Sequence, residues 1–159
     1  MAINDEDLGY LRRCVELARS ALDAGDEPFG SLLIDADGKT RFEDRNRVQG
    51  GDATRHPEFE IARWATSNLS PAERVRATVY TSGEHCPMCS AAHAWVGLGR
   101  IVYAASSTQL TGWRSEWGTA PSPVAPLPIS AIAPGIEVDG PAPELAEAMK
   151  ALYEAKFRP

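Results

Sequence analysis

Residues 74 to 106 alternate between short runs of β-forming residues and one helical segment, and this alternation constrains the fold more than any other feature. The runs "RVRATVYTS" (74–82) and "RIVYAAS" (100–106) predict strands. Between them, "CPMCSAAHAWVGLG" (86–99) predicts a helix with Pro87 just inside its start. Because the helix has to cross over the sheet, such a unit makes its two strands parallel. An α/β protein is therefore predicted.

The flanking segments extend this pattern. The predicted elements are a helix at 5–24, capped by Asn4 or Asp5 and ended by Gly25, a hairpin at 31–44, a helix at 56–69, a short last strand at 129–133 and a C-terminal helix at 141–157. Four prolines make 118–128 a loop. Two strand–helix–strand units predict a partly parallel sheet with helices on both faces, in a single domain spanning 1–159.

Composition excludes several classes of protein. The net charge is −6 and the isoelectric point is near 5.1, with no basic stripe of the kind that binds nucleic acid. Three cysteines are too few for a disulfide scaffold. The acidic N-terminal stretch does not resemble a signal peptide, and no apolar run approaches the ~20 residues that span a bilayer. We therefore expect a cytoplasmic protein without a membrane partner.

Three residues with metal-ligating side chains stand at predicted helix starts. His56 precedes Pro57, while Cys86 and Cys89 share one face of the first turn of the next helix. Partial positive charge at a helix N-terminus lowers thiol pKa values and favours thiolates. Two thiolates and one imidazole make three zinc ligands. Three protein ligands leave a fourth position for water, which is the catalytic pattern.

Glu58 is the predicted proton carrier of this centre. It stands two residues after His56, an offset that turns it away from the ligand direction but keeps it at the same helix end. Zinc lowers the pKa of a bound water towards ~7. A glutamate in a dry site can take the proton of that water and hand it on. Glu60 is interpreted more simply as a solvated helix residue.

Two other interpretations of the cysteine pair stay open. A structural zinc site needs four protein ligands, and His93 is the one spare candidate, although a packed helix histidine is the simpler interpretation. A redox C-x-x-C would need neither His56 nor Glu58. Cys14 lies beside the apolar stripe of its helix and is interpreted as packing. Zinc analysis separates these cases.

With these motifs in order, the sequence resembles the cytidine deaminase-like superfamily, and most of all its guanine deaminase and tRNA adenosine deaminase branch. The resemblance runs from residue 8 to 117 and rests on "PFGSLLI" (28–34), Asn46, "HPEFE" (56–60), "VYTSGEHCPMC" (79–89) and "RIVYAAS" (100–106). It implies a three-layer α/β/α fold with a five-stranded mixed sheet, a homodimer, zinc held by His56, Cys86 and Cys89, and Glu58 as the acid and base.

The resemblance also implies contacts to a substrate. Asn46 would hydrogen-bond a nucleobase and Phe29 would pack on it. In the guanine deaminase branch a C-terminal segment closes the site and can supply a second acid. Here "GWRSEWG" (112–118) is the candidate, with Glu116 as the acid and Trp113 or Trp117 as the aromatic wall.

The chain departs from the family pattern at two positions. His85 stands where a proline usually precedes the first cysteine, and is expected either at the rim of the site or on the surface. Its neighbour Glu84 either anchors the loop or rims the site. Pro57 stands where the family usually has alanine, whose N–H can donate to the base; proline has no N–H. Losing one polar partner changes substrate choice strongly.

The predicted function is zinc-dependent hydrolytic deamination of a small free nucleobase or related heterocycle. Candidates are a guanine-like purine, a cytosine-like pyrimidine or a triazine. Water would attack the ring carbon that bears the amine, and Glu58, with Glu116 as a second acid, would protonate the nitrogen that leaves as ammonia. A tRNA adenosine deaminase remains the alternative, but the acidic composition counts against nucleic acid.

Overall fold

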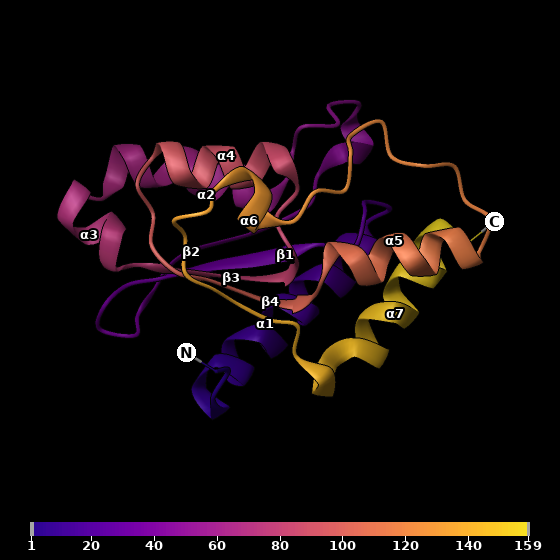
Figure 1. Ribbon diagram of the computed structural model, residues 1–159, viewed down its shortest axis with the longest axis horizontal. Coiled ribbons are helices and arrows are strands. Elements are labelled where there is room, and N and C mark those ends of the chain that lie inside the picture. The colour runs from indigo at the N-terminus through magenta and orange to yellow at the C-terminus, as the bar shows by residue number, and fades with distance from the viewer. Residues whose placement is uncertain (1, 159) are drawn as a thin grey trace.

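A five-stranded mixed sheet forms the centre of the computed structural model, which describes residues 2–158 (Figure 1). Its strand order is β2-β1-β3-β4-β5. The strands are β1 (Gly30–Ile34), β2 (Thr40–Arg45), β3 (Thr78–Gly83), β4 (Ile101–Ala105) and β5 (Val138–Asp139). β1 pairs antiparallel with β2 and β3, whereas β3–β4 and β4–β5 are parallel. The mixed sheet expected from the sequence is confirmed.

Helices cover both faces of the sheet (Figure 1). One face carries α1 (Asp5–Asp23) and α7 (Pro143–Phe157), with α5 (Ser107–Glu116) packed on α7. The other carries α2 (Pro57–Asn68), α3 (Pro71–Arg76), α4 (Pro87–Trp95) and α6 (Ile129–Ile132), and a short 3-10 turn, η1 (Val48–Gly50), follows β2. The three-layer architecture is therefore confirmed. Within residues 2–158, no helix is long and apolar enough to cross a membrane.

Local sequence explains how α1 begins and where it packs. Asn4 and Asp7 form a capping box, in which each side chain accepts a hydrogen bond from the other residue's backbone N–H. The apolar face of α1 lies directly on β1. A Cβ on Gly30 would lie only 2.4 Å from the Cβ of Leu17, so only glycine allows this close approach. Cys14 is fully buried here and free, which agrees with its interpretation as a packing residue.

Three segments differ from the sequence-based expectation. The strand expected from residue 74 begins at Thr78, because residues 71–76 form α3 behind a capping box of Ser70 and Glu73. The expected last strand at 129–133 is wrong: these residues form α6, whose first N–H, that of Ile129, donates to the Glu84 carboxylate at 2.9 Å. The fifth strand is Val138–Asp139 instead. Helix α5 was not expected at all.

A buried ion pair joins α1 to the sheet. Arg100 donates two hydrogen bonds to the carboxylate of Asp7, at 3.0 and 3.2 Å, and one to Asp139 at 2.8 Å. The Tyr80 hydroxyl also donates to Asp7, at 2.7 Å. Burial by itself raises the pKa of Asp7, but the hydrogen bonds from Arg100, the Asn4 amide and Tyr80 outweigh it and leave the pKa below its usual value.

Asp7→Asn is expected to lower the free energy of unfolding by about 2 kcal/mol at neutral pH, because Arg100 and Tyr80 lose hydrogen bonds to a charged carboxylate. A depressed folded pKa stabilises the protein above the unfolded value of about 3.9, and this contribution disappears as the pH falls through the lower folded pKa. The gap between wild type and variant should therefore close below pH ~4. Urea titrations from pH 2 to pH 7 measure it, with exposed Asp5→Asn as control; equal losses in both variants would contradict the buried pair.

Candidate metal centre and active site

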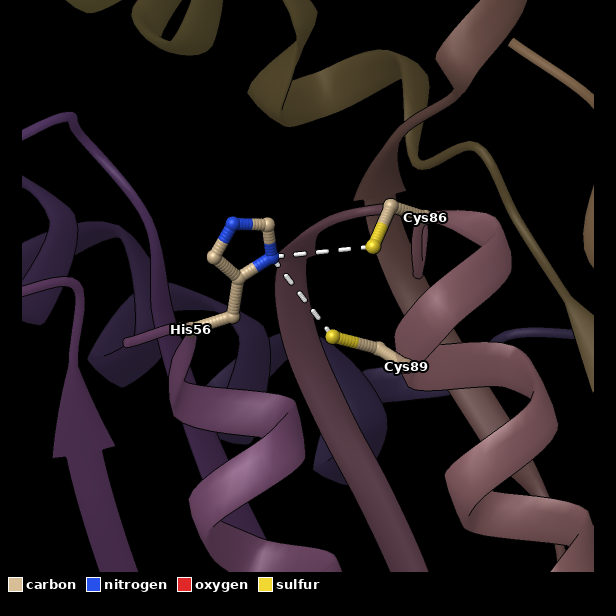
Figure 2. Close-up of side chains that lie close together, drawn as sticks. All are labelled: His56, Cys86 and Cys89. Carbon is tan, nitrogen blue, oxygen red and sulfur yellow. Dashed lines mark hydrogen bonds between the residues drawn. The ribbon is translucent and has the colours of Figure 1, made fainter. Parts of the chain in front are cut away.

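His56, Cys86 and Cys89 meet between the starts of α2 and α4 (Figure 2). The Nδ1 atom of His56 lies 3.6 Å from the Sγ atom of Cys86 and 3.6 Å from that of Cys89. All three ligand atoms lie within 4.8 Å of one another. Residues from two separate helices thus point at one small volume.

The helix starts explain this convergence. His56 is the N-cap of α2 and Cys86 is the N-cap of α4, and each is followed by a proline in the first helical turn. N-cap side chains often bond their own helix, as those of Ser70 and Ser106 do. The side chains of His56 and Cys86 turn toward each other instead.

The donor set and its spacing fit zinc. With Zn–S near 2.3 Å and Zn–N near 2.0–2.1 Å, a tetrahedral centre puts nitrogen and sulfur about 3.6 Å apart. The two separations between the His56 nitrogen and the cysteine sulfurs are both 3.6 Å. Among residues 2–158 the cluster holds no fourth His, Cys, Asp or Glu ligand. Three protein ligands are typical of a catalytic zinc site and not of a structural one.

The two thiols differ in acidity. Hydrogen bonds with the Cys89 thiol and with His56 lower the pKa of Cys86 to about 4 against the effect of burial. The hydrogen bond with Cys86, together with burial, raises the pKa of the Cys89 thiol. Both cysteines would bind zinc as thiolates, and the low pKa of Cys86 favours that form before a metal is present.

Glu58, in the first turn of α2, is buried next to Cys89, with 5% of its surface exposed. Its Oε1 atom accepts hydrogen bonds from the Ser31 hydroxyl at 2.9 Å and the Thr81 hydroxyl at 3.0 Å. Burial raises the pKa of Glu58 and the nearby Cys86 adds to the rise, while His56 and these two hydroxyls oppose it. A buried carboxyl with a raised pKa is suited to holding a proton and passing it on.

Ser31 and Thr81 are site residues that the sequence reasoning missed. Both are fully buried. Ser31 is the one polar side chain of β1, which hints that it needs a polar partner, but β3 also contains Thr78, Tyr80 and Ser82, so the sequence does not single out Thr81.

Asn46 and Phe29 lie next to each other in the fold, although they are far apart in sequence. The Phe29 carbonyl accepts from the Asn46 backbone N–H at 3.0 Å. The side-chain Oδ1 of Asn46 is buried and accepts from the backbone N–H groups of Glu27 and Val48. These donors fix the orientation of the amide and leave its NH₂ as the group able to donate to a ligand.

The remaining predicted site residues are spread more widely. Pro57 is buried at the first position of α2, beside His56. Trp113 packs between α5 and α7, with its ring 6.1 Å from that of Tyr153, which in turn lies 5.5 Å from Phe29. Glu116 is the last residue of α5 and is exposed. No contact joins Glu116 to the ligand cluster in the part of the chain that the structure describes.

His85, the residue before Cys86, is fully buried, at neither the rim nor the surface, and neither of its ring nitrogens has a hydrogen-bond partner among the described residues. Its ring meets that of His93 edge-on at 5.4 Å. His93 lies within 2.7 Å of the Gly99 carbonyl, the packed interpretation made from the sequence. Burial lowers the pKa of both histidines, so both are neutral. Neither joins the ligand cluster.

Glu84 anchors the loop. One carboxylate oxygen accepts from the Ser107 backbone N–H and hydroxyl at 2.9 and 3.0 Å, and the other accepts from the Ile129 N–H. Of the two roles considered for Glu84, the structure supports the anchor. The starts of α5 and α6 are thereby tied to the turn that carries Cys86.

The fold and the three-ligand centre define a zinc-binding α/β protein. A family model described as the cytidine and deoxycytidylate deaminase zinc-binding region matches residues 4–105. This span holds all three ligands and Glu58 and covers more than half of the chain. The protein belongs to this family of zinc-binding deaminases.

Two relatives and one solved structure each match more than half of this chain. The chain is 33% identical over 119 residues to the probable cytosine deaminase of Schizosaccharomyces pombe, covering 75% of this chain and 72% of that protein. It is 36% identical over 101 residues to the guanine deaminase of Bacillus subtilis, covering 62% and 64%. A solved protein in complex with 2,6-diaminopurine matches with a TM-score of 0.72 and 25% identity, covering 98% and 84%. tRNA-specific adenosine deaminases are also among the relatives, so the substrate is not fixed.

Proposed function

We propose that this protein is a zinc-dependent hydrolase that removes an exocyclic amine, as ammonia, from a free nucleobase or a related heterocycle. The observation that carries the proposal is the buried Glu58 carboxylate, two residues after the ligand His56 and within hydrogen-bond reach of Cys89, beside a three-ligand His-Cys-Cys centre. The cytosine and guanine deaminases among the relatives support a base as the substrate. We also propose that the chain forms a single domain, assembles as a homodimer and acts in the cytoplasm.

Each site residue has its own proposed role. His56, Cys86 and Cys89 hold the zinc, which when bound lowers the pKa of a water molecule at its open position towards ~7. Glu58 would take one proton from the attacking water and deliver it to a ring nitrogen. It would then take a second proton, from the hydroxyl now on the ring carbon, and deliver it to the amine, which leaves as ammonia while the carbonyl forms. Phe29 packs on the ring, and the Asn46 NH₂ donates to it. We propose Glu116 as a second acid, and Trp113 as an aromatic side chain that lines the substrate site.

A substrate panel tests the proposal. Guanine, 2,6-diaminopurine, cytosine and an amino-substituted triazine are each incubated with the purified protein, beside the matching nucleosides and a tRNA anticodon stem. Ammonia release from at least one free base is expected. The isoelectric point near 5.1 disfavours the tRNA, because binding it depends on cationic contacts with phosphates. Activity on the anticodon stem without activity on any free base would overturn the choice.

Pro57→Ala is expected to change the order of preference within that panel. The substitution restores a backbone N–H beside the zinc ligand His56, and a polar partner next to the ring can change discrimination by 10-fold or more. The ratio of kcat/KM between bases is the measurement. Pro71→Ala, at the first position of the exposed helix α3, is the matched control and should leave the ratio unchanged. An identical substrate profile in Pro57→Ala would rule the idea out.

A further inference from the structure

Three buried polar side chains meet on the sheet face below α2. Ser31 and Thr81 are Cα partners across the antiparallel pair of β1 and β3, so their side chains lie side by side. Their hydroxyl oxygens are 2.9 Å apart, and each is also within hydrogen-bond distance of Glu58 Oε1. Thr81 in addition reaches the carbonyl of Gly83 at 2.9 Å.

These contacts outnumber the protons available to make them. Each hydroxyl has one proton. The Ser31 hydroxyl has two acceptors in reach, Glu58 and Thr81, and the Thr81 hydroxyl also has two, Glu58 and the Gly83 carbonyl. Two protons are available for four contacts, so the four hydrogen bonds cannot all form at the same time.

Two of the arrangements use both hydroxyl protons. In one, Ser31 and Thr81 both donate to Glu58 Oε1, which holds this oxygen against the sheet. In the other, Thr81 donates to the Gly83 carbonyl and Ser31 donates to Thr81. This second arrangement withdraws both donors from Glu58 Oε1, and it leaves no hydroxyl proton without an acceptor. Rotation about the Cβ–O bonds converts one arrangement into the other without moving the backbone.

We propose that Ser31 and Thr81 are positioning residues for Glu58, and that their two hydroxyls fix where its Oε1 atom lies. The proposal rests on the proposed function, in which Glu58 is the proton carrier. By holding Oε1 against the sheet, the pair also keeps the second carboxylate oxygen aligned for proton transfer.

The test measures kcat, KM and bound zinc in three variants, using a base that the wild type deaminates. Ser31→Ala and Thr81→Val each remove one hydroxyl and are expected to lower kcat about tenfold, because a hydrogen bond to a charged group is lost. KM and zinc content should stay close to wild type. Thr81→Ser retains the hydroxyl and should restore most of kcat, a rescue that a role in packing alone would not give.

Ser82→Ala is the matched control. Ser82 is equally buried, and its hydroxyl accepts from the Gly30 N–H at 3.0 Å, so the variant loses a comparable hydrogen bond away from Glu58. It should lower the melting temperature but not kcat per bound zinc. Wild-type kcat in Ser31→Ala and Thr81→Val would overturn the positioning role and leave the proposed function standing, as would a loss in Thr81→Ser as deep as in Thr81→Val. A wild type that releases no ammonia from any base would instead remove the proposed function itself.

Discussion

Glu58→Gln is expected to stop ammonia release while leaving zinc in place. Glutamine has nearly the same shape, and its Oε1 can still accept from the Ser31 and Thr81 hydroxyls, so the fold should persist. The amide cannot carry a proton, and the loss of general acid–base catalysis costs about 10²–10⁴ in rate. Steady-state kcat and metal analysis on the same sample are the measurements.

Glu60→Gln is the control for this experiment. Glu60 lies on the same helix, its side chain is 28% exposed, and it forms an ion pair with Arg55 at 3.2 Å. The variant should keep nearly full activity, because an exposed ion pair contributes little. Full turnover in Glu58→Gln would refute the role of Glu58 as proton carrier.

Cys89→Ala is expected to lose both zinc and activity. The change leaves His56 and Cys86 as ligands, too few for a stable tetrahedral centre. Wild-type protein should bind about one zinc per chain. Treatment with a chelator should remove its activity, and adding zinc back should restore it. Metal content by mass spectrometry and ammonia release are read together.

Cys14→Ala separates metal binding from the loss of a cysteine. Cys14 is free and buried in α1, away from the cluster, so the variant should keep its zinc and lose only some stability. Wild-type protein without zinc, or activity that survives complete removal of the metal, would revive the redox interpretation of the cysteine pair.

The elements predicted correctly carry their own boundary signals. Prolines mark the first turns of α2 and α4, and the D-G turn marks the β1–β2 hairpin. The same signals were present for two elements that were missed: α3 and α5 each begin with a serine capping box. α6 is different, because its residues favour a strand and its first N–H is satisfied by distant Glu84. Tertiary contacts decide such short segments.

The site residues also divide into those that the sequence indicates and those that only the tertiary structure brings together. His56, Cys86 and Cys89 were predictable because zinc ligands follow narrow rules of residue type and spacing. The residues that hold Glu58 were not predicted, since Ser31 and Thr81 lie far apart in sequence and meet only through strand pairing. His85 was misplaced for a similar reason, because its burial depends on how His93 packs.

The anchoring of α5 and α6 by Glu84 has a consequence for how this protein can diverge. Both ends of the stretch from 107 to 129 are fastened to a single carboxylate, two residues before Cys86. The proline-rich loop inside that stretch can therefore change in length or composition while its attachment points stay fixed, since longer loops cost little entropy. Descendants of this sequence could gain insertions in this loop without displacing the turn that carries Cys86.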